Sequence, residues 1–156
     1  MKITLISLLM MGLAQCSDQP SVTTDTAADS IIIRSGTSFG FSTEYTNKDL
    51  ELVGTKATFT KRSLRNPDKY PTRTCTKTLT TNKAAELNVL SRFSEFRKQP
   101  EVIDCPDCAD GGLEYVEVQV GELRHKVKFD YGKTIPGFET LVKDLRAQRN
   151  LFNDCE

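Results

Sequence analysis

The sequence carries no net charge, no tryptophan and only one histidine. Its 21 lysine and arginine residues balance its 21 aspartate and glutamate residues, so the whole chain has no electrostatic attraction to nucleic acid or to an anionic membrane. It contains no phosphate-binding glycine loop, and its one Gly-x-Ser-x-Gly pattern, residues 36–40, lies in a stretch of small residues with no helical pattern after it. The strand-turn-helix context of a hydrolase elbow is therefore not predicted. The single histidine, His125, falls at an apolar position of a strand pattern. That position is typical of a core side chain rather than of a catalytic base.

Long apolar runs are scarce as well, and the clearest one lies at the N-terminus. It covers residues 3–11, directly after Lys2, and is too short to span a bilayer. Small residues follow at Gly12 and Ala14. This arrangement is typical of a secretory signal peptide, which we expect to cover residues 1–15.

A cysteine follows this signal directly. The sequence Leu13-Ala14-Gln15-Cys16 resembles the lipobox of bacterial lipoproteins. The resemblance implies that Cys16 becomes the first residue of the mature chain and carries acyl chains such as palmitate. More than one chain anchors a protein stably, because each buried methylene contributes about 0.8 kcal/mol. The alternative is cleavage after Ala14, which would leave a secreted protein without lipid.

The segment after this cysteine, residues 17–30, is polar throughout most of its length. A flexible chain of this length reaches roughly 20 Å, so we expect residues 16–30 to tether a folded domain just clear of the bilayer. By the usual rule of the lipoprotein class, Ser17 after the lipidated cysteine implies delivery to the outer membrane. The remaining residues, 31–156, are enough for one domain with its own core.

Alternating apolar and polar residues predict β-strands in this domain. Residues 50–60 and 116–129 read as hairpins that turn at glycines. A stretch rich in glycine, serine and threonine, residues 35–43, is expected to end a first strand that opens at residues 31–33. A threonine-rich strand is predicted over residues 72–80.

Two helices are predicted from apolar residues at helical spacing. The first is expected to be capped by Thr81 or Asn82 and to continue to about Arg97, and the second has Pro136 in its first turn and ends near Leu151. The strands come as hairpins and do not alternate with helices, which favours an antiparallel arrangement. The sequence therefore predicts an α+β fold, with an antiparallel sheet of about five strands and two helices packed on one face.

Four cysteines remain besides Cys16. An even number outside the cytoplasm suggests two disulfides, and the sequence leaves all three pairings open. The four are Cys75, Cys105, Cys108 and Cys155.

The pair Cys105 and Cys108 lies in an acidic, glycine-containing segment and could be a redox centre. A redox cysteine needs a stabilised thiolate, whereas the neighbouring carboxylates of Asp104, Asp107 and Asp110 would raise a thiol pKa. We therefore expect a disulfide-stapled loop whose glycines let the chain reverse.

Two metal sites are alternatives for the same segment. Zinc would need Cys75 and Cys155 as further ligands beside the pair. Calcium would be held by oxygens of Glu101 and of the three aspartates, which follow at a spacing of three residues. Neither the second cysteine pair of a zinc motif nor the alternating spacing of an EF-hand loop is present, so we expect no metal and no cofactor.

Charges of opposite sign are segregated along the domain. Residues 54–80 contain seven bases and one acid, and residues 99–122 contain seven acids and no base. The two segments could lie side by side and neutralise each other across the sheet. Alternatively, the acidic rim formed by Asp104, Asp107 and Asp110 could dock a cationic protein, or the basic loop could contact an anionic lipid or glycan.

The domain resembles the small envelope lipoproteins that carry a Cys-Pro-Asp-Cys-Ala-Asp-Gly-Gly segment, here residues 105–112. This resemblance implies a location and no activity. We expect a non-enzymatic interaction module, anchored to the lipid bilayer of the bacterial envelope through Cys16. It would bind an envelope protein or glycan rather than nucleic acid, for example as an inhibitor of a cationic hydrolase. The alternative function is a thiol-redox or metal-dependent enzyme centred on Cys105 and Cys108.

Overall fold

A six-stranded antiparallel sheet forms the centre of the molecule. The computed structural model describes residues 31–108 and 111–155, so the signal, the lipobox and the tether expected before residue 31 lie outside the described residues. The strands lie in the order β4-β3-β2-β1-β5-β6, and each pairs antiparallel with its neighbours. The strands are β1 (Ile31–Ser38), β2 (Asn47–Val53), β3 (Lys56–Arg62), β4 (Arg73–Thr78), β5 (Leu113–Val120) and β6 (Leu123–Asp130).

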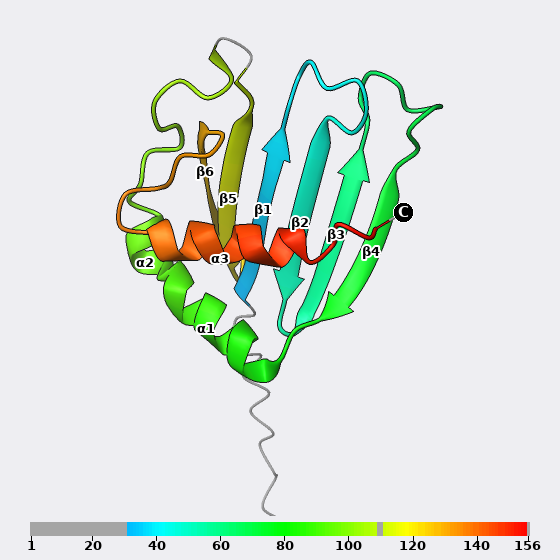
Figure 1. Ribbon diagram of the computed structural model, residues 1–156. Coiled ribbons are helices and arrows are strands. Elements are labelled where there is room, and N and C mark those ends of the chain that lie inside the picture. The colour runs from blue at the N-terminus through cyan, green and yellow to red at the C-terminus, as the bar shows by residue number, and fades with distance from the viewer. Residues whose placement is uncertain (1–30, 109–110, 156) are drawn as a thin grey trace, which may run out of the picture.

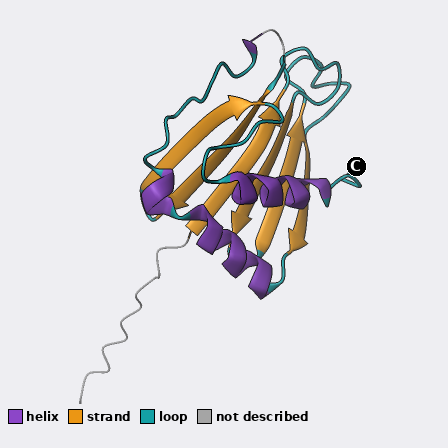
Figure 2. Cartoon of the chain, turned by 60° about the vertical axis from the view of Figure 1, so that its left-hand side comes forward, coloured by secondary structure: helices purple, strands orange, loops and turns teal. Residues whose placement is uncertain are grey.

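The helices are α1 (Thr81–Ser91), α2 (Phe93–Phe96) and α3 (Glu139–Asn150). Figure 1 shows α3 crossing the sheet from the side of β6 toward β4, near which the chain ends, and Figure 2 gives a second view of the helices beside the sheet. An α+β fold with an antiparallel sheet is thus confirmed. The number of strands is six rather than about five.

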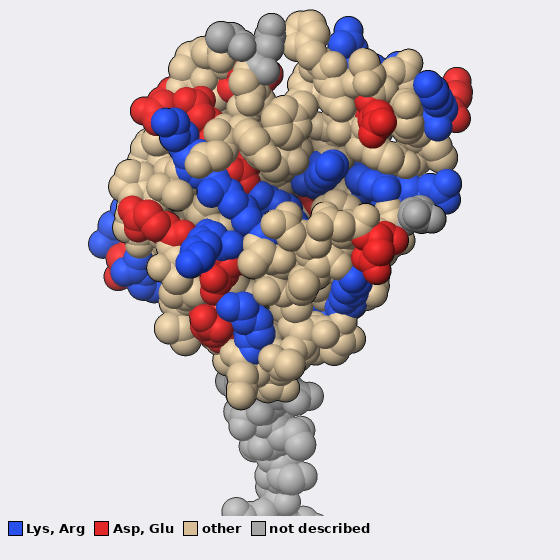
Figure 3. Space-filling view, viewed as in Figure 1, with Lys and Arg blue, Asp and Glu red and all other residues tan. Residues whose placement is uncertain are grey.

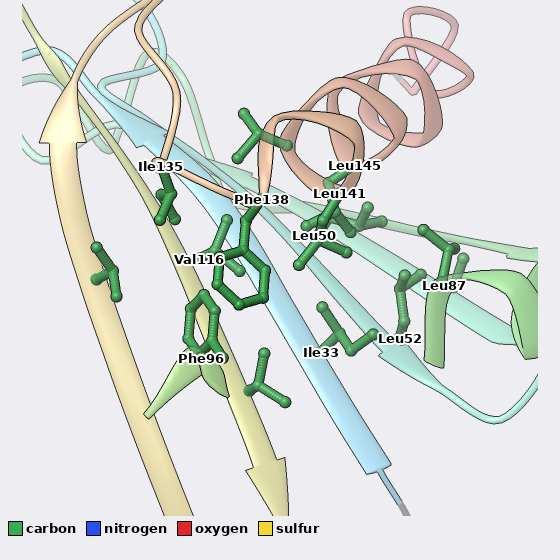
Figure 4. Close-up of a cluster of buried hydrophobic side chains, with 14 of the residues drawn as sticks. Ile33, Leu50, Leu52, Leu87, Phe96, Val116, Ile135, Phe138, Leu141 and Leu145 are labelled. Atoms are coloured by element: carbon green, nitrogen blue, oxygen red, sulfur yellow. The ribbon is translucent and has the colours of Figure 1, made fainter. Parts of the chain in front are cut away.

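One hydrophobic core joins the sheet to the helices (Figure 4). The alternating positions Leu50 and Leu52 of β2 and Val116 and Val118 of β5 are all buried, as expected for one face of a sheet with period-two side chains. From the helices, the core receives Leu87, Phe96, Leu141, Val142 and Leu145.

The first strand is longer than the sequence indicated. β1 continues through Ser35, Gly36 and Thr37 to Ser38 and pairs along its length with both β2 and β5. The expectation that small residues end the strand after residue 33 is therefore wrong. Glycine is required in the middle of this strand, because a Cβ at Gly36 would lie 2.6 Å from Oδ1 of Asp49 and 2.7 Å from Cε1 of Tyr115.

The first predicted helix is divided into two. Its N-cap is Thr80 and not Thr81 or Asn82 as predicted, because the Oγ1 atom of Thr80 accepts a hydrogen bond from the Lys83 backbone N–H at 3.2 Å. Arg92 then adopts a left-handed conformation with φ of 33° and separates α1 from α2. This turn places Phe96 in the core, edge-on to Phe138 at 5.2 Å, so packing overrides the continuous helical pattern.

The last helix begins later than predicted. Pro136 lies in a turn ahead of α3, and the helix itself starts at Glu139 after Phe138. The Glu139 carboxylate accepts a hydrogen bond from the Gly137 N–H at 2.9 Å. The positive φ of 78° at Gly137 explains the shift, since a left-handed residue does not belong to a right-handed helix.

Candidate functional site

The four cysteines of the domain form two disulfides. Cys75 on β4 pairs with Cys155 near the C-terminus, with 5.9 Å between their Cα atoms, and Cys105 pairs with Cys108. The prediction of two disulfides is confirmed, and the pairing that the sequence left open is decided. Cys16, the predicted lipidation site, lies outside the described residues.

The segment around Cys105 and Cys108 is a tight exposed loop. The Cys108 N–H donates to the Cys105 carbonyl at 3.0 Å, and Oδ1 of Asp107 accepts a hydrogen bond from the Gly112 N–H at 3.1 Å. Asp104 and Asp107 both have positive φ. Asp107 thus helps to shape the loop, while the third aspartate of the predicted rim, Asp110, lies outside the described residues.

The metal ligands considered from the sequence are not brought together. Cys75 and Cys155 are bonded to each other and so do not join Cys105 and Cys108 as four free thiolates. Within residues 31–108 and 111–155, no three side chains of histidine, cysteine, aspartate or glutamate gather in a way that could hold a metal ion.

His125 is half-buried at the edge of the core. Its Nε2 atom lies 2.9 Å from the Gln99 carbonyl oxygen, and its ring is edge-on to Phe96 at 5.8 Å. These contacts agree with the prediction of a core histidine.

The two segments of opposite charge lie apart in the sheet, with β1 and β2 between β3 and β5. The basic segment forms β3 and β4, whereas the acidic stretch before β5 runs beside β6. Its backbone bonds to that strand, with Lys128 N–H donating to the Glu101 carbonyl at 2.8 Å and Ile103 N–H to the Lys128 carbonyl at 2.9 Å. The two segments therefore do not neutralise each other side by side, and this expectation is wrong.

A cavity of about 430 Å³ lies where the acidic stretch meets β6. Its lining mixes acids and bases, among them Glu101, Glu117, Lys126 and Lys128. Lys126 already lies 3.7 Å from the Glu117 carboxylate and 3.8 Å from the centre of the Tyr115 ring. The charges here are thus partly paired within the protein.

A second cavity, of about 290 Å³, has a predominantly basic lining and is named here the basic cavity. It lies between the sheet and the C-terminal part of α3 with the residues that follow this helix. Lysine and arginine side chains form a band across this side of the molecule (Figure 3). The charged lining residues are Lys48, Lys61, Arg146, Arg149 and Glu114, and the aromatic ones are Phe39, Phe59, Tyr131 and Phe152.

A row of cations begins in the sheet side of this cavity, where Lys48 and Lys61 are lining residues, and continues beyond the lining to Arg73. Lys48 on β2 is paired with Lys61 on β3, and Lys61 is paired with Arg73 on β4. Directly opposed side chains have Cβ atoms about 5 Å apart, and like charges at such positions are destabilising. Among the residues that the structure describes, no carboxylate lies within 4.0 Å of these three cations. The name cation row is used below for Lys48, Lys61 and Arg73.

A buried ion cluster forms the opposite side. Glu114 is 1% exposed, and its carboxylate bonds to both Arg146 and Arg149. Arg149 also donates to Ser35 Oγ, and Arg146 to the Lys133 carbonyl. Burial by itself would raise the pKa of Glu114, but the hydrogen bonds and charges of the two guanidiniums outweigh burial, and its pKa lies below the ordinary value.

Aromatic rings complete the lining. Phe39 and Tyr131 meet edge to face at 4.7 Å, and Phe59 stacks on Phe152 at 5.2 Å. Phe152 follows α3 and is held close to β4 by the neighbouring Cys155–Cys75 disulfide. The basic cavity thus combines unneutralised positive charge with aromatic surface.

Sequence reasoning missed this cavity. The signal that could have found it is strand parity, because Lys48 shares parity with the buried Leu50 and Leu52, and Lys61 with the buried Phe59. A lysine at such a position departs from the alternation of apolar and polar residues, and here Lys48 is exposed and Lys61 is half-buried. The number of basic residues in a segment does not show which face of the sheet they occupy.

Comparisons with known proteins add no assignment. Neither the models of known protein families nor the curated proteins include a match to this sequence. Among the helices in residues 31–108 and 111–155, none has the length and apolar content needed to cross a bilayer.

Proposed function

We propose that this protein is a non-enzymatic binding module, anchored by lipid at Cys16 in the bacterial envelope, and that the basic cavity holds its partner. The signal peptide, the lipobox-like sequence and the polar tether support the location. The partner is an envelope protein or glycan, and the expected membrane is the outer membrane.

The cation row is the observation that carries the assignment of the site. Three cations stand next to one another on the core-facing side of three adjacent strands. Such an arrangement opposes folding through like-charge repulsion. A bound partner with negative charge would remove the repulsion, which explains why the fold retains it.

The ion cluster beside the row favours binding over catalysis. A general base needs a carboxylate with a free oxygen and a pKa near the working pH. Both oxygens of Glu114 are engaged by arginines, and its pKa is held below the ordinary value. Glu114 therefore fixes the two arginines in place and is a poor proton acceptor.

The opposite side of the sheet offers less to a partner. In this proposal the helices cover one face, and the charged groups of the other face, including Lys126 and Glu117 in the cavity of about 430 Å³, are partly paired with one another. Arg34 bonds to Glu51 and Glu117 at 2.8 Å each, and Tyr115 donates to Asp49 at 2.8 Å. Because these groups already satisfy one another, the partner is expected on the helix side.

The site is tested by affinity capture from envelope extract with the full-length protein. The double variant Lys48→Gln/Lys61→Gln should lose the captured partner. Lys56→Gln should retain it, because Lys56 lies on the same strand as Lys61 but points to the other face. Retention by the double variant, with loss on Asp104→Asn, would instead place the docking surface on the acidic rim.

The anchor is tested separately. Cys16→Ser should move the protein from the membrane fraction to the soluble fraction, while Ser17→Ala should leave it membrane-bound. The intact mass of the wild-type chain should match acylation at residue 16. A membrane-bound Cys16→Ser variant would contradict the anchor.

A thiol-redox enzyme is the second candidate, favoured by the exposure of both Cys105 and Cys108 and by their bond within a single turn. Its test is a titration of free thiols with and without reductant, together with a measurement of bound metal. A pair that cycles with a protein thiol substrate would support the enzyme. Thiols that appear only after complete reduction, together with the absence of metal, would support the binding module.

A further inference from the structure

The chemistry of the cation row indicates which ligand the basic cavity takes. We infer that Lys48, Lys61 and Arg73 bind a phosphomonoester or diphosphate group. This inference rests on the proposal that the basic cavity is the binding site. It adds the chemical class of the ligand.

The charge of the row points to a group with more than one negative charge. Three cations across adjacent strands extend over about 10 Å, because neighbouring strands lie about 4.8 Å apart. A single carboxylate neutralises only one of them. A phosphate monoester carries a charge of about −1.5 to −2 and has three strong acceptor oxygens, so one such group, or two joined in a diphosphate, matches the row.

The arginines across the cavity do not compete for this role. Arg146 and Arg149 are both bonded to Glu114, which neutralises one of their two charges and fixes both guanidiniums on the opposite wall. Lysine remains a common phosphate ligand as a point charge on a flexible stem. The lysine ends of the row can therefore converge on a phosphate while the arginines hold the opposite wall.

The aromatic part of the lining suits the remainder of the ligand. Phe39 and Tyr131 form an edge-to-face pair on the cavity wall, and Tyr131 is 52% exposed. An exposed aromatic pair beside a charged group can receive the apolar part of an organic phosphate. A free inorganic anion would leave this surface unused.

The part of the cavity wall formed by Phe152 and Asn153 is tied covalently to β4. Cys75 is two residues from Arg73 on β4 and is bonded to Cys155, which follows the lining residues Phe152 and Asn153. Lys77 on the same strand donates to the Asp154 carboxylate at 3.0 Å. The cavity is thus held open in a fixed shape before a ligand arrives, which lowers the entropic cost of binding.

The test is a thermal-shift and calorimetric titration of the full-length protein, purified in a non-ionic detergent. The probes are inorganic pyrophosphate, glycerol 3-phosphate, a short-chain phosphatidic acid and citrate. Pyrophosphate and glycerol 3-phosphate should raise the Tm of the wild type, because a ligand that binds only the native state stabilises it. Citrate should bind at least tenfold more weakly than pyrophosphate. Tighter binding of the phosphatidic acid than of glycerol 3-phosphate would assign the phosphate to a lipid headgroup, and the reverse would assign it to a phosphomonoester on a partner that is not a lipid, such as an envelope glycan.

Matched variants locate the site. Lys48→Gln and Lys61→Gln should each weaken pyrophosphate binding at least tenfold, whereas Lys56→Gln should change it less than twofold. Without ligand, the first two variants should be as stable as the wild type or more stable, because each removes like-charge repulsion. This measurement separates lost binding from failed folding.

Two results would overturn the inference. One is an unchanged Tm of the wild type with millimolar pyrophosphate, and the other is equal binding by all three lysine variants. If pyrophosphate fails to bind but the Lys48→Gln/Lys61→Gln variant still loses its partner from envelope extract, the proposed binding function stands and only the phosphate assignment is wrong. If that variant keeps the partner, the proposed site itself is wrong.

Discussion

At the scale of single residues, Gly36 shows how one missing side chain organises a face of the sheet. Gly36 lies opposite Asp49 on one neighbouring strand and opposite Tyr115 on the other. The Tyr115 hydroxyl reaches across it and donates to Asp49 at 2.8 Å. Burial, followed by the charge and hydrogen bond of Asp49, raises the pKa of Tyr115, so this phenol stays protonated and remains a donor at physiological pH.

Replacing this glycine should therefore disturb three strands at once. Gly36→Ala places a methyl group where Asp49 and Tyr115 meet, and overpacking of this kind costs about 1–3 kcal/mol. We expect a lower urea midpoint with an unchanged m-value. Gly40→Ala is the control, because the nearest heavy atom to its Cβ would be 3.9 Å away, and equal stability losses for the two variants would contradict the steric explanation.

The buried carboxylate of Glu114 gives a second prediction at this scale. Glu114→Gln leaves the charges of Arg146 and Arg149 without their acid, and breaking a buried ion pair on one side costs about 3 kcal/mol. The exposed pair of Glu51 with Arg34 is the control, and Glu51→Gln should cost less than about 1 kcal/mol. Chemical unfolding at neutral pH measures both.

The pH dependence of this loss has a defined sign. The folded pKa of Glu114 is below the ordinary value, so the unfolded chain binds the proton more readily. The contribution to stability is complete above the unfolded pKa of about 4.3 and is lost as pH falls through the lower folded pKa. The gap between wild type and Glu114→Gln should thus be constant near neutral pH and shrink in acid, and a gap that grew in acid would contradict the ion-cluster account.

At the scale of elements, α1 and α3 are joined by an ion pair between Lys83 and Asp144 at 2.7 Å. The hydrogen bond to Asp144 raises the pKa of Lys83. The contribution of this ion pair to folding stability is complete below the pKa of lysine in the unfolded chain, and it is lost as pH rises through the higher pKa of the folded state. The ion pair therefore links α1 to α3 throughout the physiological pH range.

Asp144→Asn should loosen α1 without unfolding the domain. A partly exposed pair contributes up to about 1 kcal/mol, so we expect a small fall in global stability and faster amide hydrogen exchange in α1. Glu86→Gln is the control, because Glu86 contacts the same lysine from within α1 at 3.0 Å. Similar exchange in both variants would show that the pair does not join the helices.

The elements also show what the sequence could and could not predict. Both hairpins follow from period-two alternation around Gly54 and Gly121, which both have positive φ at their turns. The extension of β1 could not be predicted, because Ser35 and Gly36 disfavour a strand locally. Their contacts come from distant parts of the chain: Arg149 donates to Ser35 Oγ, and Tyr115 occupies the space that a Cβ at Gly36 would need. The break at Arg92 likewise depends on packing of Phe96.

The candidate site was hidden for a related reason. Its charged groups come from β2, β3, β5 and α3, so no local motif marks it. Strand parity could have indicated Lys48 and Lys61, whereas the meeting of Glu114 with Arg146 and Arg149 depends on how α3 crosses the sheet.

At the scale of the whole molecule, the two disulfides differ greatly in the length of chain that they close. The Cys75–Cys155 bond joins residues 80 apart in the sequence, and the Cys105–Cys108 bond joins residues 3 apart. The chain-entropy relation gives about 4.5 kcal/mol for the first and about 2 kcal/mol for the second. The long-range bond should therefore dominate the stability of the oxidised protein.

The paired variants test this difference. Cys75→Ser/Cys155→Ser should lose about twice as much stability in urea unfolding as Cys105→Ser/Cys108→Ser, by the relation between loop length and entropy. It should also weaken capture of the partner, because Phe152 and Asn153 then lose their fixed position beside the cavity. Equal losses for the two pairs would show that the unfolded chain is not governed by loop closure.

The position of β1 has a mechanical consequence. The strand nearest the N-terminus is also central in the sheet, hydrogen-bonded to β2 on one side and to β5 on the other. A pull on the chain ahead of Ile31 acts along this strand and loads two ladders of hydrogen bonds in shear. If the domain is held at a membrane through that end, traction from a bound partner acts on a strand that is hydrogen-bonded along both of its edges.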